Sequence, residues 1–191
     1  TYGIYNNGEL VDTYTTDADG SFMTRYYVCG DGWTIREIEP STGYLLNETI
    51  YEVGASPSLY EVELNTTENQ VTETVIYGNI QLVKHTDDLD PDVPEDENTD
   101  DPNAGIIERP EAGAVFEVTA AEDIYTADFQ KDAEGNRILE YAAGERVGTV
   151  TTDENGEAFL SNLPLGSYKI VEVTAPEGFV LNEEAQTVTF T

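Results

Sequence analysis

The sequence carries the same series of motifs twice, and this internal repeat restricts the fold more than any other feature. Each copy has an apolar run, a turn rich in aspartate and glycine, and a long stretch around a glutamate. Three blocks in the same order indicate two copies of one domain. The matching blocks are 2–5 with 116–119, 15–20 with 151–156, and 32–48 with 167–183.

Both copies alternate apolar and polar residues with a period of two, as in Trp33 and Ile35 or Tyr168 and Ile170. Asp-Gly, Asn-Gly and Pro-Glu-Gly sequences separate these runs, which predicts short antiparallel strands. We therefore expect an all-β protein of two tandem immunoglobulin-like, Greek-key β-sandwich domains. The predicted inward-facing residues are Ile4, Trp33, Ile35, Leu46, Val53, Phe116, Val118, Ile170, Leu181 and Val188.

The repeat places the junction near Gly78 and predicts domains at 1–78 and 79–191. Aligned with each other, the first copy lacks its first strand and the second lacks its last strand. Each copy therefore exposes an unpaired sheet edge, which predicts strand pairing with another molecule. Residues 86–105 are strongly acidic and lack apolar periodicity, so we expect a mobile surface loop there.

The composition excludes several classes of function. There are 39 acidic and 8 basic residues, a formal net charge of −31. Such a charge repels phosphate backbones and anionic lipids, so we expect neither nucleic acid nor membrane-surface partners. The sequence contains no long apolar run, so we expect no membrane insertion. Cys29 is the only cysteine, so the chain cannot form an internal disulfide.

The stretch 168–179, Tyr-Lys-Ile-Val-Glu-Val-Thr-Ala-Pro-Glu-Gly-Phe, resembles the E-box of a known domain family. This family comprises the Cna protein B-type, or SpaA-type prealbumin-like, domains of Gram-positive surface adhesins and pilins. The segments 113–118 and 153–156 extend the resemblance over most of the second copy, and the first copy is more divergent. The resemblance implies a non-enzymatic stalk or spacer without a cofactor, extracellular and anchored to the cell wall, whose partners are neighbouring repeats.

The resemblance also implies an isopeptide bond between a lysine of the first strand and an asparagine or aspartate of the last strand. Lys84 matches the lysine nucleophile, and Glu172 matches the E-box glutamate that shuttles protons. Glu37 is the E-box match in the first copy. That copy has no lysine, and Glu73 aligns with its acceptor position, so we expect Glu37 to be inactive there. The acceptor of Lys84 is expected beyond Thr191.

An alternative function is adhesion. Exposed aromatic side chains such as Tyr26, Tyr27 and Trp33 would then form a recognition patch for a host extracellular protein or glycan. Exposure of these rings favours the adhesive function, whereas burial of Trp33 favours the stalk. A third possibility, an enzyme, has no support, because the sequence contains no recognisable catalytic triad, metal cluster or phosphate loop.

Three further residue types have ordinary structural explanations. Asp88, Asp90 and Asp92 alternate as in a calcium loop, but the glycine and glutamate of an EF-hand are missing. Weak calcium binding by the acidic loop stays open beside a solvated loop. His85 is expected at a strand end. Cys29 lies beside two glycines and is expected in a turn or as a half-buried small residue.

Overall fold

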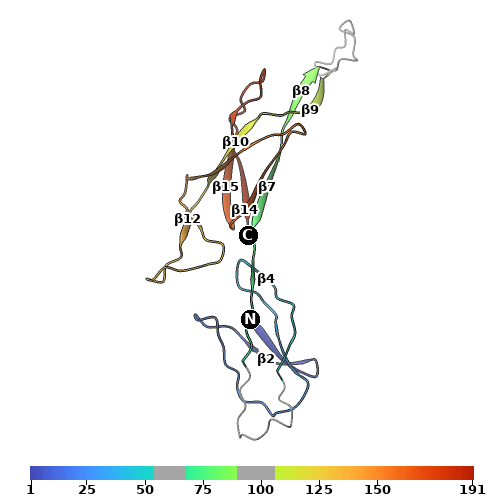
Figure 1. Cartoon of the computed structure of the whole chain (residues 1–191), viewed down its shortest axis with the longest axis vertical. Helices are drawn as coiled ribbons and strands as arrows, with labels where there is room; N and C mark the ends of the chain where they lie inside the picture. The colour runs from blue at the N-terminus through green and yellow to red at the C-terminus, as the bar shows by residue number, and fades with distance from the viewer. Residues whose placement is uncertain (54–67, 90–105) are drawn as a thin grey trace. The chain divides into compact units, whose positions relative to one another are not determined.

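A computed structural model describes residues 1–53, 68–89 and 106–191. Every regular element in these ranges is a β-strand, which confirms the predicted all-β class (Figure 1). The chain forms two compact units, Thr1–Ile76 and Tyr77–Thr191, here called unit 1 and unit 2. The domain boundaries taken from the repeat stay a prediction. Among the described residues there is no helix of the length and apolar character needed to cross a membrane.

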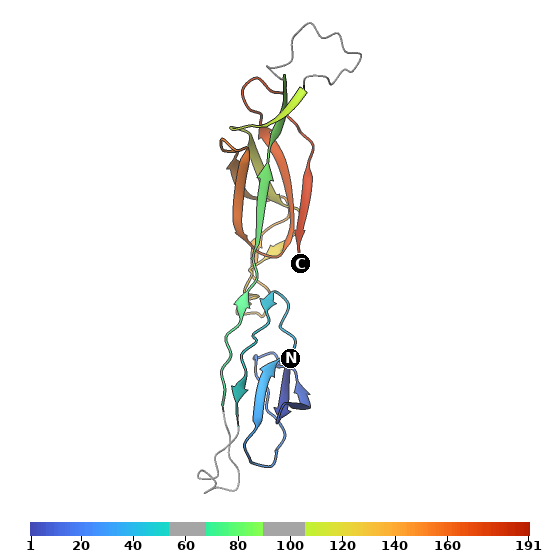
Figure 2. The same ribbon diagram turned by 90° about the vertical axis from the view of Figure 1, so that its right-hand side faces the viewer.

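Unit 1 contains a four-stranded antiparallel sheet in the order β2-β1-β3-β5. In the pairing of β1 with β3, Tyr2 lies opposite Glu37 and Ile4 lies opposite Ile35. A second, two-stranded sheet joins β4 and β6, which Figure 2 shows as two short arrows. The strands are β1 (Tyr2–Asn6), β2 (Glu9–Tyr14), β3 (Trp33–Glu37), β4 (Tyr44–Leu45), β5 (Tyr51–Glu52) and β6 (Thr74–Val75).

Aromatic rings fill much of the interior of unit 1. The Phe22 ring stacks on both Tyr2 and Tyr14, with centroid distances of 5.4 Å in each case. Tyr2 and Ile4 are buried, as their alternation along β1 requires. Such rings contribute a large apolar area to the core of this unit.

Unit 2 contains a four-stranded antiparallel sheet in the order β13-β10-β15-β16 and three two-stranded sheets, β14-β7, β11-β12 and β8-β9. The first strands are β7 (Gly78–Val83), β8 (His85–Leu89), β9 (Ile106–Pro110), β10 (Val115–Ala120) and β11 (Ile124–Tyr125). The others are β12 (Leu139–Tyr141), β13 (Arg146–Thr151), β14 (Glu157–Leu163), β15 (Gly166–Thr174) and β16 (Gln186–Phe190).

The core of unit 2 lies between its large sheet and the β7–β14 pair. Alternate residues of β10 and β15, such as Val118 and Ile170, face Ile80 of β7. Tyr168 is completely buried, and its hydroxyl donates a hydrogen bond of 2.7 Å to the Pro164 carbonyl oxygen. Burial is the main cause that raises the pKa of Tyr168. This packing fixes the strands that carry the candidate site.

The prediction of burial is wrong for two residues, which occupy equivalent positions in the repeat. Leu46 is 43% exposed and Leu181 is 37% exposed. The alternation fails because β4 ends at Leu45, and Leu181 lies outside any strand. Ile4, Val118 and Ile170 are buried as predicted, and the remaining predicted core residues are half-buried.

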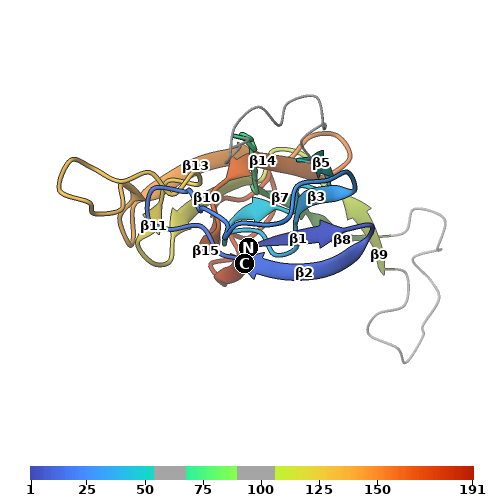
Figure 3. The same cartoon turned by 90° about the horizontal axis from the view of Figure 1, so that it is seen from below.

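The predicted acidic loop 86–105 is partly wrong as well. Residues 86–89 belong to β8, which pairs with β9 in a two-stranded sheet, and the two strands lie side by side in Figure 3. Pairing with 106–110 overrides the acidic composition of this stretch, because the ladder satisfies the backbone of both strands. Residues 90–105, with Asp90 and Asp92 of the calcium alternative, lie outside the described residues.

Candidate functional site

Lys84 occupies the single position between β7 and β8, and backbone hydrogen bonds hold it on both sides. Its amide nitrogen donates to the Gly156 carbonyl oxygen at 2.8 Å, and its carbonyl oxygen accepts from the Glu111 amide at 3.0 Å. The first bond continues the ladder between β7 and β14. The backbone of Lys84 is therefore fixed, which restricts where its ammonium group can reach.

The structure brings Lys84 and Glu172 together inside unit 2. The Lys84 Nζ atom lies 3.3 Å from Oε1 and 3.4 Å from Oε2 of Glu172. The side chains are 18% and 1% exposed, respectively. A buried carboxylate is costly unless it is paired, so Lys84 and Glu172 depend on each other. The catalytic roles predicted for the two residues stay predictions.

The carboxylate of Glu172 is also oriented by the backbone. Its Oε2 atom accepts a hydrogen bond of 2.9 Å from the Asn182 amide, and the Asn182 side chain accepts one from the Glu184 amide at 3.0 Å. The buried Oε1 atom is in ion-pair contact with Lys84 Nζ at 3.3 Å, but it accepts no well-aligned hydrogen bond from any residue that the structure describes. One carboxylate oxygen is thus held in place while the other keeps capacity for a further donor.

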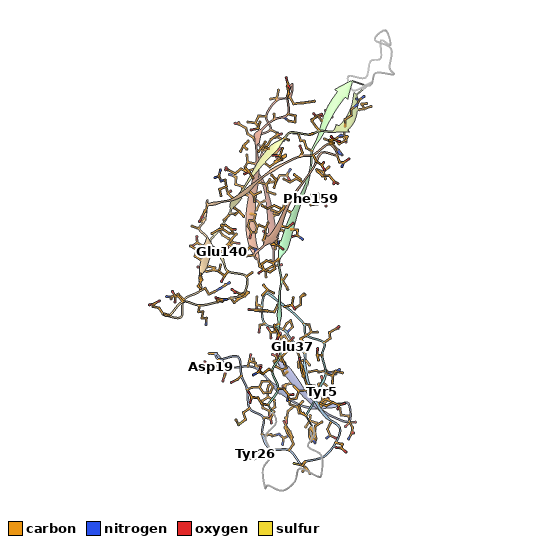
Figure 4. All side chains as sticks on the ribbon, in the orientation of Figure 1. Tyr5, Asp19, Tyr26, Glu37, Glu140 and Phe159 are labelled. Atoms are coloured by element: carbon orange, nitrogen blue, oxygen red, sulfur yellow. The ribbon has the colours of Figure 1, made fainter. Side chains whose placement is uncertain are left out.

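Unit 1 repeats this arrangement around Glu37, which lies in the interior of the unit (Figure 4). The Glu37 Oε2 atom accepts a hydrogen bond of 2.7 Å from the Asn47 amide, and the Asn47 side chain accepts one from the Thr49 amide at 3.0 Å. The Asn47 side chain also donates to the Thr72 carbonyl oxygen at 3.1 Å. The same turn therefore orients the E-box glutamate in both units.

Unit 1 surrounds its glutamate with different partners. Glu73 and the Tyr2 hydroxyl lie close enough to Glu37, and to each other, to influence one another's protonation. Burial, followed by the neighbouring Glu37 carboxylate, raises the pKa of Glu73. Burial and the charges of Glu37 and Glu73 raise the pKa of Tyr2 to about 12. This site therefore contains two carboxyl groups and a phenol where unit 2 contains a carboxylate and an amine.

Sequence reasoning identified Glu37 and Glu73 but missed Tyr2. The signal was present in the repeat, because Tyr2 and Phe116 occupy the same register. Tyr2 pairs with Glu37 across β1 and β3, and Phe116 pairs with Glu172 across β10 and β15. Tyr2 has a hydroxyl that Phe116 lacks, and this difference opposite the E-box glutamate was the signal of an additional titratable group in unit 1.

The other singled-out residues lie away from both glutamates. His85 is half exposed at the start of β8, with Nδ1 3.8 Å from the Glu108 carboxylate. Cys29 is an exposed free thiol. Within residues 1–53, 68–89 and 106–191, no group of three or more His, Cys, Asp or Glu side chains is placed to hold a metal ion.

Comparisons with known proteins concern the family and the fold of the chain. The family model of the SpaA prealbumin-like fold domain matches residues 1–74 and 108–191. None of the curated proteins matches the chain. The TIE protein of Bacillus anthracis is 19% identical with a TM-score of 0.61, and the match covers 99% of this chain and 27% of that protein.

Two solved pilus proteins also align over nearly the whole chain. The RrgB pilus protein of Streptococcus pneumoniae is 16% identical, with a TM-score of 0.36, and 38% of it is covered. The pilus 2b backbone protein of group B streptococcus is 18% identical, with a TM-score of 0.37 and 69% covered. This chain spans about a quarter of the length of the TIE protein described above. By the extent of the family match, this chain belongs to the SpaA family of prealbumin-like fold domains.

Proposed function

We propose that this chain is a structural stalk segment of a bacterial cell-surface adhesin or pilin, and that unit 2 is built to form an internal isopeptide bond. The observation that carries the proposal is the contact of Lys84 Nζ with Glu172 at 3.3 Å in the interior of unit 2. Membership of the SpaA family and the repeated units support the stalk function. The protein then acts outside the cell, attached to the wall, with neighbouring repeats as its partners.

The proposed reaction joins Lys84 to an asparagine or aspartate on a strand beside β7. Within the described residues β7 pairs with β14 alone, so its other edge can accept that strand. The uncharged amine of Lys84 attacks the side-chain carbonyl carbon of the acceptor. Glu172 takes the proton from the nitrogen and passes it to the leaving group. Ammonia leaves from asparagine or water from aspartate, and one amide bond remains.

The capacity of Glu172 Oε1 to accept a further hydrogen bond suits the attack of Lys84 on the acceptor carbonyl. The atom is buried and accepts no well-aligned hydrogen bond from a described residue, while Oε2 is held by the Asn182 amide. An acceptor side chain beside Lys84 would supply a hydrogen-bond donor to Oε1 as an amide N–H or a protonated carboxyl. Glu172 then orients the acceptor carbonyl against Lys84. The reaction occurs once per molecule and requires no cofactor.

Such a bond would strengthen a protein under tension. It would tie the first strand of unit 2 to its last strand, so that pulling on the ends could not separate them. A disulfide serves this purpose in other extracellular proteins, but this chain has one cysteine.

The adhesive alternative has weaker support from the three aromatic residues that suggested it. Trp33 is half-buried, and its ring packs on Tyr27 at a centroid distance of 4.7 Å. The Tyr27 hydroxyl donates to the Asp12 carboxylate at 2.6 Å. Only Tyr26 of the three is largely exposed, at 80% (Figure 4). One exposed ring is a small basis for a recognition patch.

The intact mass of a longer polypeptide tests the crosslink. A polypeptide that continues past Thr191 through one more strand should lose one ammonia or one water from its calculated mass. Glu172→Ala should keep the full mass, because the proton shuttle is absent, and Lys84→Met should keep it because the nucleophile is absent. Tandem mass spectrometry should locate the new amide at Lys84.

The control is Lys169→Met, which removes a lysine of β15 that does not contact Glu172 in the described structure. It should undergo the same mass loss as the parent. Full calculated mass in the folded parent polypeptide would refute the isopeptide proposal. A loss that persists in Glu172→Ala would refute the role of the glutamate.

A further inference from the structure

Residues 175–185 carry the chain from β15 to β16 without forming a strand, and on the way they contact the carboxylate of Glu172. Every residue of 177–185 is exposed, and Val180 is 90% exposed. Burial of side chains therefore contributes little to the conformation of this segment. Local hydrogen bonds must supply its order instead.

Asn182 makes the hydrogen bonds at the point where this segment meets Glu172. Its amide donates to Oε2 of Glu172 at 2.9 Å, and its side-chain carbonyl oxygen accepts from the Glu184 amide at 3.0 Å. The second bond is an Asx turn, in which the asparagine side chain takes the place of a backbone carbonyl and fixes the direction of the chain. The turn therefore aims the Asn182 amide at the buried carboxylate.

Unit 1 contains the same arrangement beside its own glutamate. The Asn47 amide donates to Oε2 of Glu37 at 2.7 Å, and the Asn47 side chain accepts from the Thr49 amide at 3.0 Å. The turn is thus present in both units, although the other groups around the two glutamates differ. This indicates that the turn serves to orient the glutamate itself.

The hydrogen bond to one oxygen limits how the Glu172 carboxylate can turn. Oε2 is held by the Asn182 amide, and Oε1 lies 3.3 Å from Nζ of Lys84. The Glu172 side chain is 1% exposed, so bulk water does not reach the carboxylate to replace a lost donor. Without the turn, the carboxylate would rotate more freely about its last side-chain bond and lose its alignment with the amine.

We propose that Asn182 is a positioning residue for the amide-forming reaction of Lys84, and that its side chain sets the rate by orienting Glu172. The inference rests on the crosslink proposed above for unit 2. Asn182 exchanges no atom in the reaction. Glu172 takes one proton from the Lys84 nitrogen as the nitrogen–carbon bond forms, and returns it to the ammonia or water that leaves. A carboxylate oriented in advance lowers the barrier, because less reorganisation is left to the reacting groups.

Two substitutions separate the turn from other effects of a change at this position. The Asn182 side chain is exposed, so its removal leaves no cavity in the core. Asn182→Ala keeps the backbone amide but removes the acceptor of the Asx turn. Asn182→Ser keeps an oxygen that can accept from the same amide, although more weakly.

The rate of mass loss in a polypeptide that continues past Thr191 through one more strand tests the proposal. The polypeptide is made by cell-free synthesis, kept unfolded in urea and diluted to start folding, and its intact mass is followed with time. Asn182→Ala should slow the loss of ammonia or water roughly tenfold, the effect of one hydrogen bond to a charged group. Asn182→Ser should restore the rate to within about threefold of the parent.

Asn47→Ala is the matched control, because it removes the same turn beside Glu37 in unit 1. It should leave the rate of mass loss unchanged. Circular dichroism and hydrogen exchange of the β15 amides should show that each variant is folded before its mass changes. A slower rate then cannot come from unfolded molecules.

The outcomes distinguish this inference from the crosslink itself. Mass loss at the parental rate in Asn182→Ala would overturn the positioning role and leave the crosslink intact. Equal slowing in Asn182→Ala and Asn182→Ser, or slowing in proportion to the unfolded fraction, would overturn that role as well. Full calculated mass in the folded parent would refute the crosslink and, with it, the role of Asn182.

Discussion

The carbonyl oxygen of Lys84 lies so close to Gly156 that a Cβ atom at this position would clash with it. Gly156 has a φ of 71°, so a side chain at this position would be strained in its backbone as well as obstructed. The turn before β14 and the chain at Lys84 are therefore packed backbone to backbone. This contact helps to hold the lysine against Glu172.

Gly156→Ala should destabilise unit 2 by about 2–4 kcal/mol, because the left-handed backbone and the blocked contact both cost free energy. Gly135→Ala is the matched control, since Gly135 has a φ of 86° and open space around its Cα atom. It should cost about 1 kcal/mol. Hydrogen exchange of the β7 and β14 amides in denaturant measures both. Equal losses would mean that the Lys84 contact contributes nothing.

Glu172→Gln should destabilise unit 2 by about 3 kcal/mol, because it leaves the Lys84 ammonium without its buried partner. Lys84→Met should also destabilise the unit, since it leaves the carboxylate unpaired. The double variant should lose less than the two single losses added together, with a coupling of about 2 kcal/mol. Denaturant titrations followed by circular dichroism give the cycle. Additive losses would show that the two groups do not interact in solution.

Glu73→Gln should stabilise unit 1 at pH 7. The pKa of Glu73 is raised in the folded protein, so the folded state holds this proton more tightly than the unfolded chain. That contribution is complete below the unfolded pKa of about 4.3 and is lost as the pH rises through the folded value. The parent and Glu73→Gln should therefore converge toward pH 4. Trp33, the single tryptophan, reports this unfolding by fluorescence, and a constant difference across this range would contradict the prediction.

Tyr2→Phe should remove part of the alkaline sensitivity of unit 1. The pKa of Tyr2 is raised from 10.0 to about 12, so its contribution to stability is complete below 10 and is lost as the pH rises to 12. Burial also raises the pKa of Tyr27, which acts equally in the parent and the variant. The parent should thus lose more stability than Tyr2→Phe between these pH values, measured by Trp33 fluorescence. Tyr26→Phe, at an exposed ring, should follow the parent.

The sequence alone predicted the architecture and the E-box residues. The internal repeat and the period of two predicted an all-β fold, because a pleated strand directs alternate side chains to opposite faces. The motif around Glu172 predicted a lysine partner, and the structure places Lys84 beside it. These features depend on local order along the chain, which a sequence displays directly.

Other features were decided by contacts between segments distant in sequence. Leu46 and Leu181 leave the apolar pattern because the chain turns to bring the Asn47 and Asn182 amides to the buried glutamates. The acidic residues 86–89 form a strand because 106–110 pairs with them.

Contacts between distant segments also decide how the surroundings of the E-box glutamate differ between the two units. The approach of Tyr2 and Glu73 to Glu37 depends on strands that lie far apart in the sequence. The sequence by itself determined which residues alternate and which motif surrounds each glutamate, because both are local. Only the tertiary structure decided which backbone edges are covered and which charges meet, because hydrogen-bond ladders and burial require partners from elsewhere in the chain.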